Sequence, residues 1–176
     1  MNNNTRSPGV ALYSLAERAR RDRSPWTRVQ AVLAPLQFLA FAVSLGLVLR
    51  FLADGQGLAA ATVSVLVKTA LLYAIMITGS LWERDVFGKF LFARAFFWED
   101  VVSMLVIALH SAYVAALLCH WLPARALMLL ALAAYASYVL NAAQFLLKFR
   151  AARRGSPPAA PLRPLSVGQG AAGALE

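Results

Sequence analysis

Four long apolar runs constrain most strongly what this chain can fold into. They cover about residues 30–52, 60–82, 96–120 and 125–148. Each has the roughly 20 residues that a helix needs to cross the hydrocarbon core of a bilayer. Strands with free edges cannot cross it, because their backbone groups would lack hydrogen-bond partners in lipid. The sequence therefore predicts an all-α integral membrane protein with four transmembrane helices in a bundle.

The basic residues predict how this bundle is oriented. Fourteen of the 17 Lys and Arg residues lie before the first span, between the second and third spans, or at and beyond the end of the fourth. Only Arg50 and Arg125 lie on the other side. Because Lys and Arg concentrate on the cytoplasmic side of membrane proteins, both termini are predicted to be cytoplasmic. The same placement suits anionic lipid headgroups, so the net charge of +9 does not indicate nucleic-acid binding.

The chain divides into three parts. Residues 1–28 are predicted to be a cytoplasmic N-terminal segment, and residues 29–149 the four-helix transmembrane domain. Residues 150–176 are basic and rich in proline, which is typical of a flexible tail.

Capping signals locate two helix starts near the N-terminus. Ser14 and Glu17 have the spacing of a capping box, which predicts a short, basic surface helix over 14–23. Ser24 and Pro25 are typical of an N-cap and the first residue of the helix that follows.

Ionisable residues at the mouth of the third span are candidate site residues. Glu99 and Asp100 open this span, and Ser103 and His110 follow Glu99 on one helix face. Such groups are costly in hydrocarbon and mostly face a protein interior or a wet cavity. Adjacent helix positions diverge by about 100°, so one carboxyl could face a site while the other pairs with a cation.

Polar residues of the other spans are predicted to form a layer in the cytoplasmic half of the bundle. At 1.5 Å per residue, Lys68 and His110 both lie about 21 Å from the cytoplasmic ends of their helices. The layer lies nearer the cytoplasm than these two, at about the depth of Glu99 and Ser103. It consists of residues of spans one and four and of the loop after span two: Gln37, Asn141, Gln144, Glu83 and Asp85. Its predicted aromatic walls are Trp82, Phe96, Phe97, Trp98, Tyr138 and Phe145. Aromatic walls with convergent polar groups suit a large, flat, amphipathic ligand.

Five strings of the sequence resemble a known family. They are Ser-Pro-Trp-Thr (24–27), Leu-Ala-Pro-Leu-Gln-Phe (33–38), Ile-Thr-Gly-Ser-Leu-Trp-Glu (77–83), Ala-Phe-Phe-Trp-Glu-Asp (95–100) and Asn-Ala-Ala-Gln-Phe-Leu-Leu-Lys (141–148). Over about residues 11–153, the chain resembles the vinyl (bacterio)chlorophyllide hydratases of photosynthetic bacteria.

This resemblance implies a hydro-lyase of bacteriochlorophyll synthesis. Such an enzyme adds water to the 3-vinyl group (2-vinyl in older numbering) of chlorophyllide a or a bacteriochlorophyllide and gives a 3-(1-hydroxyethyl) group. The resemblance also implies the bacterial inner or intracytoplasmic membrane, and other pigment-synthesis enzymes as partners. Hydration involves no net redox change, so no organic cofactor is expected, and the only metal is the magnesium that the substrate carries.

The chemistry of hydrating a vinyl group assigns roles to the candidate residues. The terminal carbon is protonated first, and water then attacks the adjacent cation, which requires an acid, an acceptor and nearby negative charge. Glu99 is expected to be the acid, with Asp100 or Glu83 ionised beside the cation. His110 is a candidate axial ligand of the substrate's magnesium. Predicted substrate contacts are Gln37, Lys68, Trp82, Arg94, Trp98, Tyr138, Asn141 and Gln144, with Arg94 or Arg84 at the propionate.

Two other functions fit the same residues. A non-catalytic pigment-binding or assembly protein would use the same aromatic walls and histidine, and a small proton-coupled transporter would use a buried carboxylate. The polar residues also have structural interpretations, because Asn141 and Gln144 can hydrogen-bond between helices in a membrane bundle. The sequence leaves the oligomeric state open.

Overall fold

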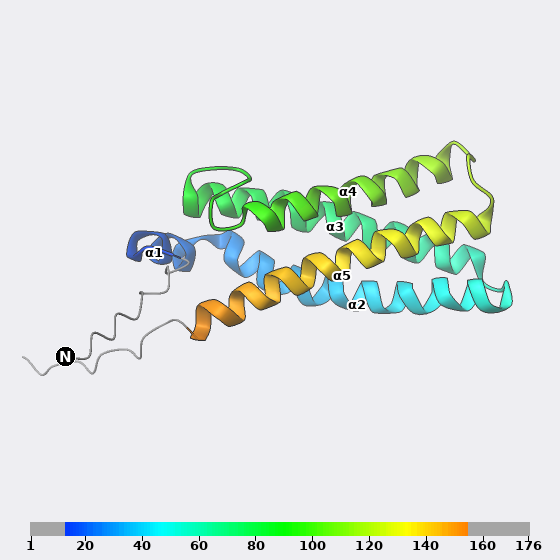
Figure 1. The fold of residues 1–176 in the computed structure, drawn as a ribbon, viewed down its shortest axis with the longest axis horizontal. Coiled ribbons are helices and arrows are strands. Elements are labelled where there is room, and N and C mark those ends of the chain that lie inside the picture. The colour runs from blue at the N-terminus through cyan, green and yellow to red at the C-terminus, as the bar shows by residue number, and fades with distance from the viewer. Residues whose placement is uncertain (1–12, 155–176) are drawn as a thin grey trace, which may run out of the picture.

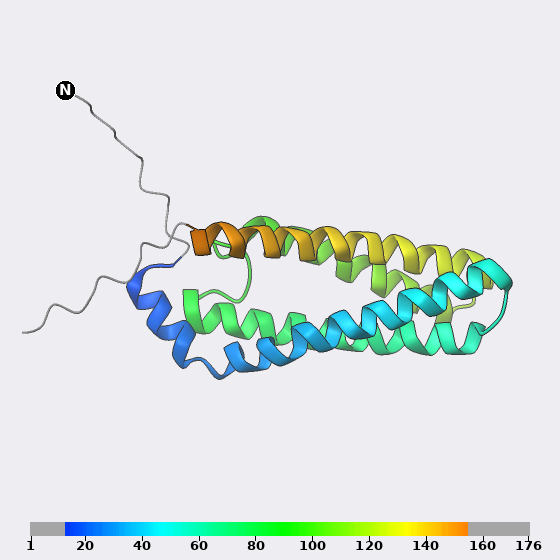
Figure 2. The same ribbon diagram turned by 90° about the horizontal axis from the view of Figure 1, so that it is seen from below.

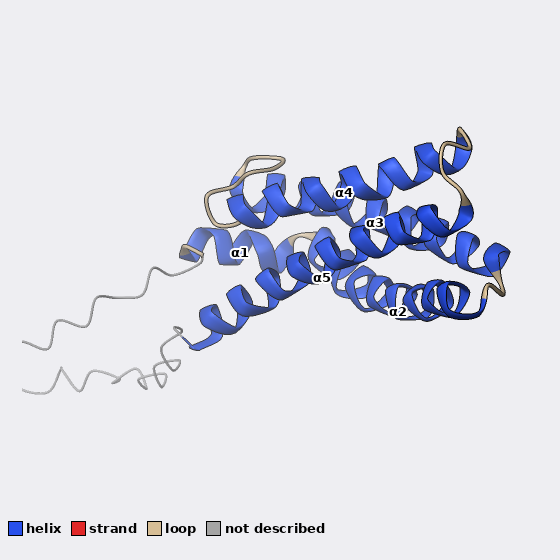
Figure 3. Ribbon diagram, turned by 45° about the vertical axis from the view of Figure 1, so that its right-hand side comes forward, coloured by secondary structure: helices blue, strands red, loops and turns tan. Residues whose placement is uncertain are grey.

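The computed structural model describes residues 13–154. Residues 150–154, predicted to begin the flexible tail, instead continue the last helix, and the rest of the predicted tail lies outside the described residues. Within this range the secondary structure is helical, with no strand (Figure 3). The helices are α1 (Leu15–Arg23), α2 (Pro25–Asp54), α3 (Leu58–Phe87), α4 (Phe97–Leu118) and α5 (Ala124–Arg154).

The two predicted helix starts near the N-terminus are confirmed. The Glu17 N–H donates to Ser14 Oγ (3.2 Å) and the Ser14 N–H donates to Glu17 Oε2 (2.7 Å), which completes the capping box of α1. No residue of α1 is buried, as expected of a surface helix. Pro25 is the first residue of α2, but the Ser24 hydroxyl donates to Asp85 Oδ2 (2.8 Å) and accepts no hydrogen bond from the N–H groups of the helix start.

The end of α3 differs from the prediction in a way that affects the site. Glu83 and Asp85 were expected in a loop after the second span, but α3 continues through them to Phe87. No Gly or Pro interrupts residues 82–87, and the helix ends where Gly88 adopts a left-handed conformation (φ 77°) that glycine tolerates best. Glu83 is therefore held on a helix.

The four long helices form two antiparallel hairpins, α2–α3 and α4–α5, which pack along each other (Figures 1 and 2). Each of the four is long and apolar enough to cross a bilayer, as predicted. α1, the 88–96 loop and the end of α5 lie together at one end of the bundle, called here the α1 end.

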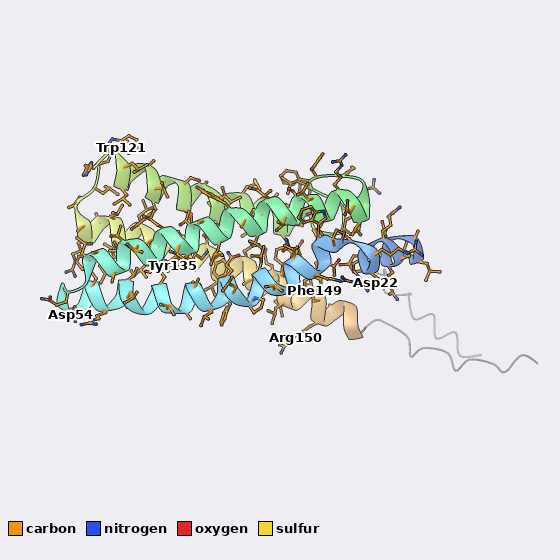
Figure 4. The ribbon with its side chains drawn as sticks, turned by 180° about the vertical axis from the view of Figure 1, so that it is seen from behind. Asp22, Asp54, Trp121, Tyr135, Phe149 and Arg150 are labelled. Carbon is orange, nitrogen blue, oxygen red and sulfur yellow. The ribbon has the colours of Figure 1, made fainter. Side chains whose placement is uncertain are left out.

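Two apolar clusters lie at different heights in the bundle. The larger one joins all four long helices and contains Phe41, Val48, Ala61, Val65, Tyr113, Ala116, Leu127, Met128, Ala131 and Tyr135. The smaller one is aromatic, lies at the α1 end and is built on Tyr13, Val86 and Phe96. In Figure 4, Tyr135 lies between the two ends of the bundle, with Asp54 and Trp121 at one end and Asp22 and Arg150 at the other.

The larger cluster predicts a cost for adding volume on α3. Ala61 is fully buried there, so Ala61→Leu should lower the free energy of unfolding by about 1–3 kcal/mol through overpacking. The measurement is thermal and denaturant unfolding in detergent. Ala60→Leu is the matched control, because Ala60 is exposed and should tolerate the added side chain. Equal effects of the two substitutions would contradict the packing described here.

Candidate functional site

The carboxyl groups of Glu83 and Asp100 lie against each other at the α1 end. Glu83 comes from the last turns of α3 and Asp100 from the first turn of α4. Both residues are buried, and the N–H groups of two consecutive loop residues reach one carboxyl each. Two buried carboxyls held so close repel each other when both are ionised, which favours a state in which they share one proton. In that state the pair has one proton to give up and one carboxylate that can accept.

The 88–96 loop fixes this pair through its backbone. The Phe92 N–H donates to Asp100 Oδ2 (2.7 Å), and the Ala93 N–H donates to Glu83 Oε2 (3.3 Å). Phe92 adopts a left-handed conformation (φ 59°), which is strained for a residue with a bulky side chain. Two adjacent backbone donors therefore hold two carboxyls from different helices. Sequence reasoning missed these donors, because any residue other than proline can supply a backbone N–H.

Glu99 has a different environment from its neighbour Asp100. Its Oε2 lies 2.6 Å from Lys148 Nζ on α5, which makes it one half of an ion pair. The Lys148 Nζ also lies 4.9 Å from the centre of the Phe96 ring. The two carboxyls thus diverge as their helix positions predict, Asp100 towards α3 and Glu99 towards α5. Glu99 was expected from the sequence to be the acid, whereas the structure pairs it with the Lys148 side chain of α5.

Aromatic side chains surround the carboxyls on two sides. On the inner side, the Phe96 ring lies 5.8 Å from Trp82 and 5.9 Å from Phe145 between ring centres. Phe97 and Trp98 were expected in the same wall but are exposed, with Trp98 at 69%. Their rings are 5.4 Å apart, and Phe97 lies 5.8 Å from the exposed Phe92 of the loop. These three residues form an outer apolar face, which we call the loop face.

Deeper in the bundle, part of the predicted polar layer is confirmed. The Asn141 Nδ2 donates to Ser103 Oγ (2.8 Å), one helical turn along α4 from Asp100. Gln144 lies on the same helix as Asn141, and Gln37 is buried on α2. The side-chain carbonyl oxygens of all three amides have no hydrogen-bond partner among the described residues. These oxygens can accept hydrogen bonds from a water or a ligand.

Lys68 and His110 lie at the same level, as their predicted depths require. Lys68 Nζ is 3.8 Å from the centre of the Tyr138 ring and 5.9 Å from that of Tyr135. The His110 ring centre is also 5.9 Å from that of Tyr135. Its Nδ1 is 2.8 Å from the Val106 carbonyl oxygen, which can only accept, so Nδ1 carries the hydrogen. Tyr138 therefore belongs to this middle layer and not to the wall around Trp82.

The two arginines that were predicted to bind the propionate do not lie at the carboxyl pair. Arg94 is exposed on the loop, and the exposed Arg84 lies over the Phe90 ring (4.9 Å to the ring centre). Among the described residues, no group of three or more His, Cys, Asp and Glu side chains is arranged to hold a metal ion.

Comparison with known proteins gives the same family from two directions. The family model described as 2-vinyl bacteriochlorophyllide hydratase matches residues 13–151. The chain is similar to the 2-vinyl bacteriochlorophyllide hydratase of Rhodobacter capsulatus, with 62% identity over 154 residues that cover 87% of this chain and 90% of that protein. It is 61% identical over 147 residues to the protein of the same name from Cereibacter sphaeroides, covering 84% and 91% of the two chains. No solved structure matches the chain.

The ion pair between α4 and α5 makes a prediction about stability. Lys148→Met should lower the free energy of unfolding by about 1–3 kcal/mol, because it leaves the buried Glu99 carboxylate without its partner. Adding Glu99→Gln should recover part of this loss, since the unpaired charge is then gone. Unfolding in detergent measures the stability of both variants. Arg150→Met is the control, because Arg150 is an exposed basic residue two positions after Lys148. If Lys148→Met alone is as stable as the parent chain, the Glu99–Lys148 ion pair contributes nothing to the free energy of unfolding.

Proposed function

The chain belongs to the 2-vinyl bacteriochlorophyllide hydratase family, and on this premise we propose that the Glu83–Asp100 pair performs the proton transfers of its reaction. The chain is a hydro-lyase that adds water to the vinyl group of a bacteriochlorophyllide. The observation that carries the proposal is that two consecutive N–H groups of the 88–96 loop hold two buried carboxyls from different helices side by side.

The reaction needs a proton donor and a proton acceptor in turn. Protonation of the terminal CH₂ turns the vinyl group into a cation on the adjacent carbon with a new methyl group. The oxygen of water then bonds to this carbon, and the water loses one proton, which leaves a 1-hydroxyethyl group. One proton is taken up and one released, and nothing is oxidised or reduced. A carboxyl pair with a single proton can give the first and accept the second.

Charge also favours this pair over Glu99 as the acid. When the pair gives up its proton it becomes more negative, just as positive charge develops on the substrate, and fixed negative charge stabilises such a cation. The two N–H donors of the 88–96 loop hold the carboxyls in place for this change. Glu99 instead lies 2.6 Å from Lys148 and serves to fasten α4 to α5.

The surroundings of the pair supply places for the substrate and for water. The loop face of Phe92, Phe97 and Trp98 offers an exposed apolar surface where the flat macrocycle can first bind, beside the carboxyls, before it enters the bundle. Asn141 and Gln144 have free carbonyl oxygens and lie deeper along the bundle, where they can orient the attacking water. His110 Nε2 keeps a lone pair in the neutral ring and fits as an axial ligand of the substrate's magnesium. Because hydration involves no net redox change, the proposed reaction needs no organic cofactor.

The same proposal includes a location in the bacterial inner membrane with the α1 end in the cytoplasm. The basic residues of α1, the 88–96 loop and the end of α5 gather at this end, whereas Arg50 and Arg125 lie near the opposite ends of their helices. This asymmetry is the one that sets orientation in membrane proteins. The carboxyl pair then lies in the cytoplasmic half, where water has access.

The first prediction separates the pair from its neighbours. Glu83→Gln and Asp100→Asn should each lower kcat by about 10²–10⁴, because general acid–base catalysis contributes that much. Glu99→Gln should keep most of the activity in protein that folds. Asp85→Asn is the matched control, as an exposed carboxyl two positions from Glu83. Turnover of a vinyl bacteriochlorophyllide, followed by absorbance and mass, measures all four. Full activity in both Glu83→Gln and Asp100→Asn would refute the assignment.

The second prediction concerns the order of bond formation. In D₂O the product should carry one carbon-bound deuterium, located in the new methyl group, because the solvent-exchanged carboxyl pair protonates the terminal carbon. Mass spectrometry and proton NMR of the isolated product locate the label. Deuterium on the carbon that bears the hydroxyl group, or no carbon-bound deuterium, would be incompatible with this route.

A further inference from the structure

Lys68 is a buried cation without a counter-ion in the middle of the bundle. It is fully buried on α3, and its Nζ has no hydrogen-bond partner among the described residues. The carboxylates lie elsewhere: Glu83 and Asp100 contact each other, and Glu99 pairs with Lys148. The Tyr138 ring, 3.8 Å from Nζ, offsets only part of the cost of burying this charge. An ammonium in this position has three donors for an anionic acceptor.

Other polar groups without partners lie around Lys68. His110 is at the same level, and its Nε2 makes no hydrogen bond within the described residues. Gln37 lies one turn before Phe41, whose ring is 5.0 Å from that of Tyr138. Both side-chain polar atoms of Gln37 lack partners in the same part of the chain. Buried polar groups are normally hydrogen-bonded, so a cluster of unpartnered ones indicates a place where a polar ligand binds.

This cluster lies at the seam between the two hairpins. Some polar residues near it do pair: Ser44 with Ser64 in α2–α3, Ser103 with Asn141 in α4–α5, and Ser44 with Tyr135 across the seam. The unpartnered groups are contributed by both sides, Gln37 and Lys68 from the first hairpin and His110 from the second. Because Lys68 is fully buried, a ligand reaches it only when the hairpins separate along this seam.

We propose that Lys68 binds a carboxylate, and that this carboxylate is the propionate of the bacteriochlorophyllide, held between the hairpins while its vinyl group lies at the Glu83–Asp100 pair. This inference rests on the proposed function. Tyr138, which contacts Lys68, is ten residues from Lys148 on α5, and thus about 15 Å along the helix from the level of the carboxyls. That separation is comparable with the reach from the vinyl group to the carboxylate of an extended propionate, two groups that neighbouring rings of the macrocycle carry.

Lys68 suits the propionate better than the arginines of the α1 end. Arg84 and Arg94 are exposed, so an ion pair with either is weakened by solvent. Lys68 binds in a dry environment, where a charge-assisted hydrogen bond is strong and a neutral ester in place of the carboxylate leaves the ammonium unpaired. The free acid should therefore bind more tightly than its ester, and this preference should depend on Lys68.

The test compares two substrates and three proteins. A vinyl bacteriochlorophyllide with a free propionate and its propionate methyl ester are each hydrated by the parent chain, by Lys68→Met and by Lys89→Met. Lys89 is the matched control, because it is an exposed lysine of the 88–96 loop. The parent chain and Lys89→Met should show a KM for the free acid about ten- to a hundredfold below that for the ester. Lys68→Met should lose this preference, because KM for the free acid rises to that for the ester.

A stability measurement separates binding from a purely structural role. Lys68→Met removes an unpaired buried charge, so its Tm in detergent should be no lower than that of the parent chain. Added free acid, but not ester, should raise the Tm of the parent chain more than that of Lys68→Met. Equal KM values for acid and ester in the parent chain, or a Lys68→Met variant that keeps the preference, would overturn the inference while the hydratase stands. No hydrated product from either substrate would instead overturn the proposed function.

Discussion

The contact between Glu83 and Asp100 depends on how α3 ends and α4 begins. Gly88 stops α3 one turn after Glu83, and the loop that follows returns the chain so that Asp100 meets Glu83 from the next helix. Within that loop, the left-handed Phe92 and its neighbour Ala93 direct consecutive N–H groups at the two carboxyls. A carboxyl pair buried without such donors would repel itself once ionised. The loop is therefore as necessary to the pair as the carboxyls themselves.

Some polar residues of the bundle connect neighbouring helices, and others have no hydrogen-bond partner among the described residues. Glu99 and Lys148 join α4 to α5 at the α1 end, and Ser103 and Asn141 join them one turn deeper. Lys68 and Gln37 form no such hydrogen bond or ion pair within the described residues, and they lie at the seam between the hairpins. In an apolar solvent each unpaired group is costly, and the ligand site proposed above rests on several such groups lying in one layer.

These features favour a hydratase over the two other functions considered from the sequence. A protein that only binds pigment has no need of a buried carboxyl pair. The family that this chain matches is described as a hydratase, not as a pigment-binding protein. The relatives do not support a proton-coupled transporter. Both are named hydratases, and the match covers 90% and 91% of their lengths. The loop face, the carboxyl pair and the middle layer instead form a continuous series from the surface to the core, suited to a flat substrate with one polar end.

The sequence alone determined the four long helices, the capping box of α1, the start of α2 at Pro25 and the divergence of Glu99 from Asp100. Each is a local or periodic property, set by apolar run length, cap chemistry or the angle between helix positions. It also marked every acidic residue of the site. Only the tertiary structure decided that Glu83 lies on a helix, that it meets Asp100, and that Lys148 takes Glu99. Those outcomes depend on the path of the 88–96 loop and on the register between helices, which follow from packing across the bundle and leave no pattern within one segment.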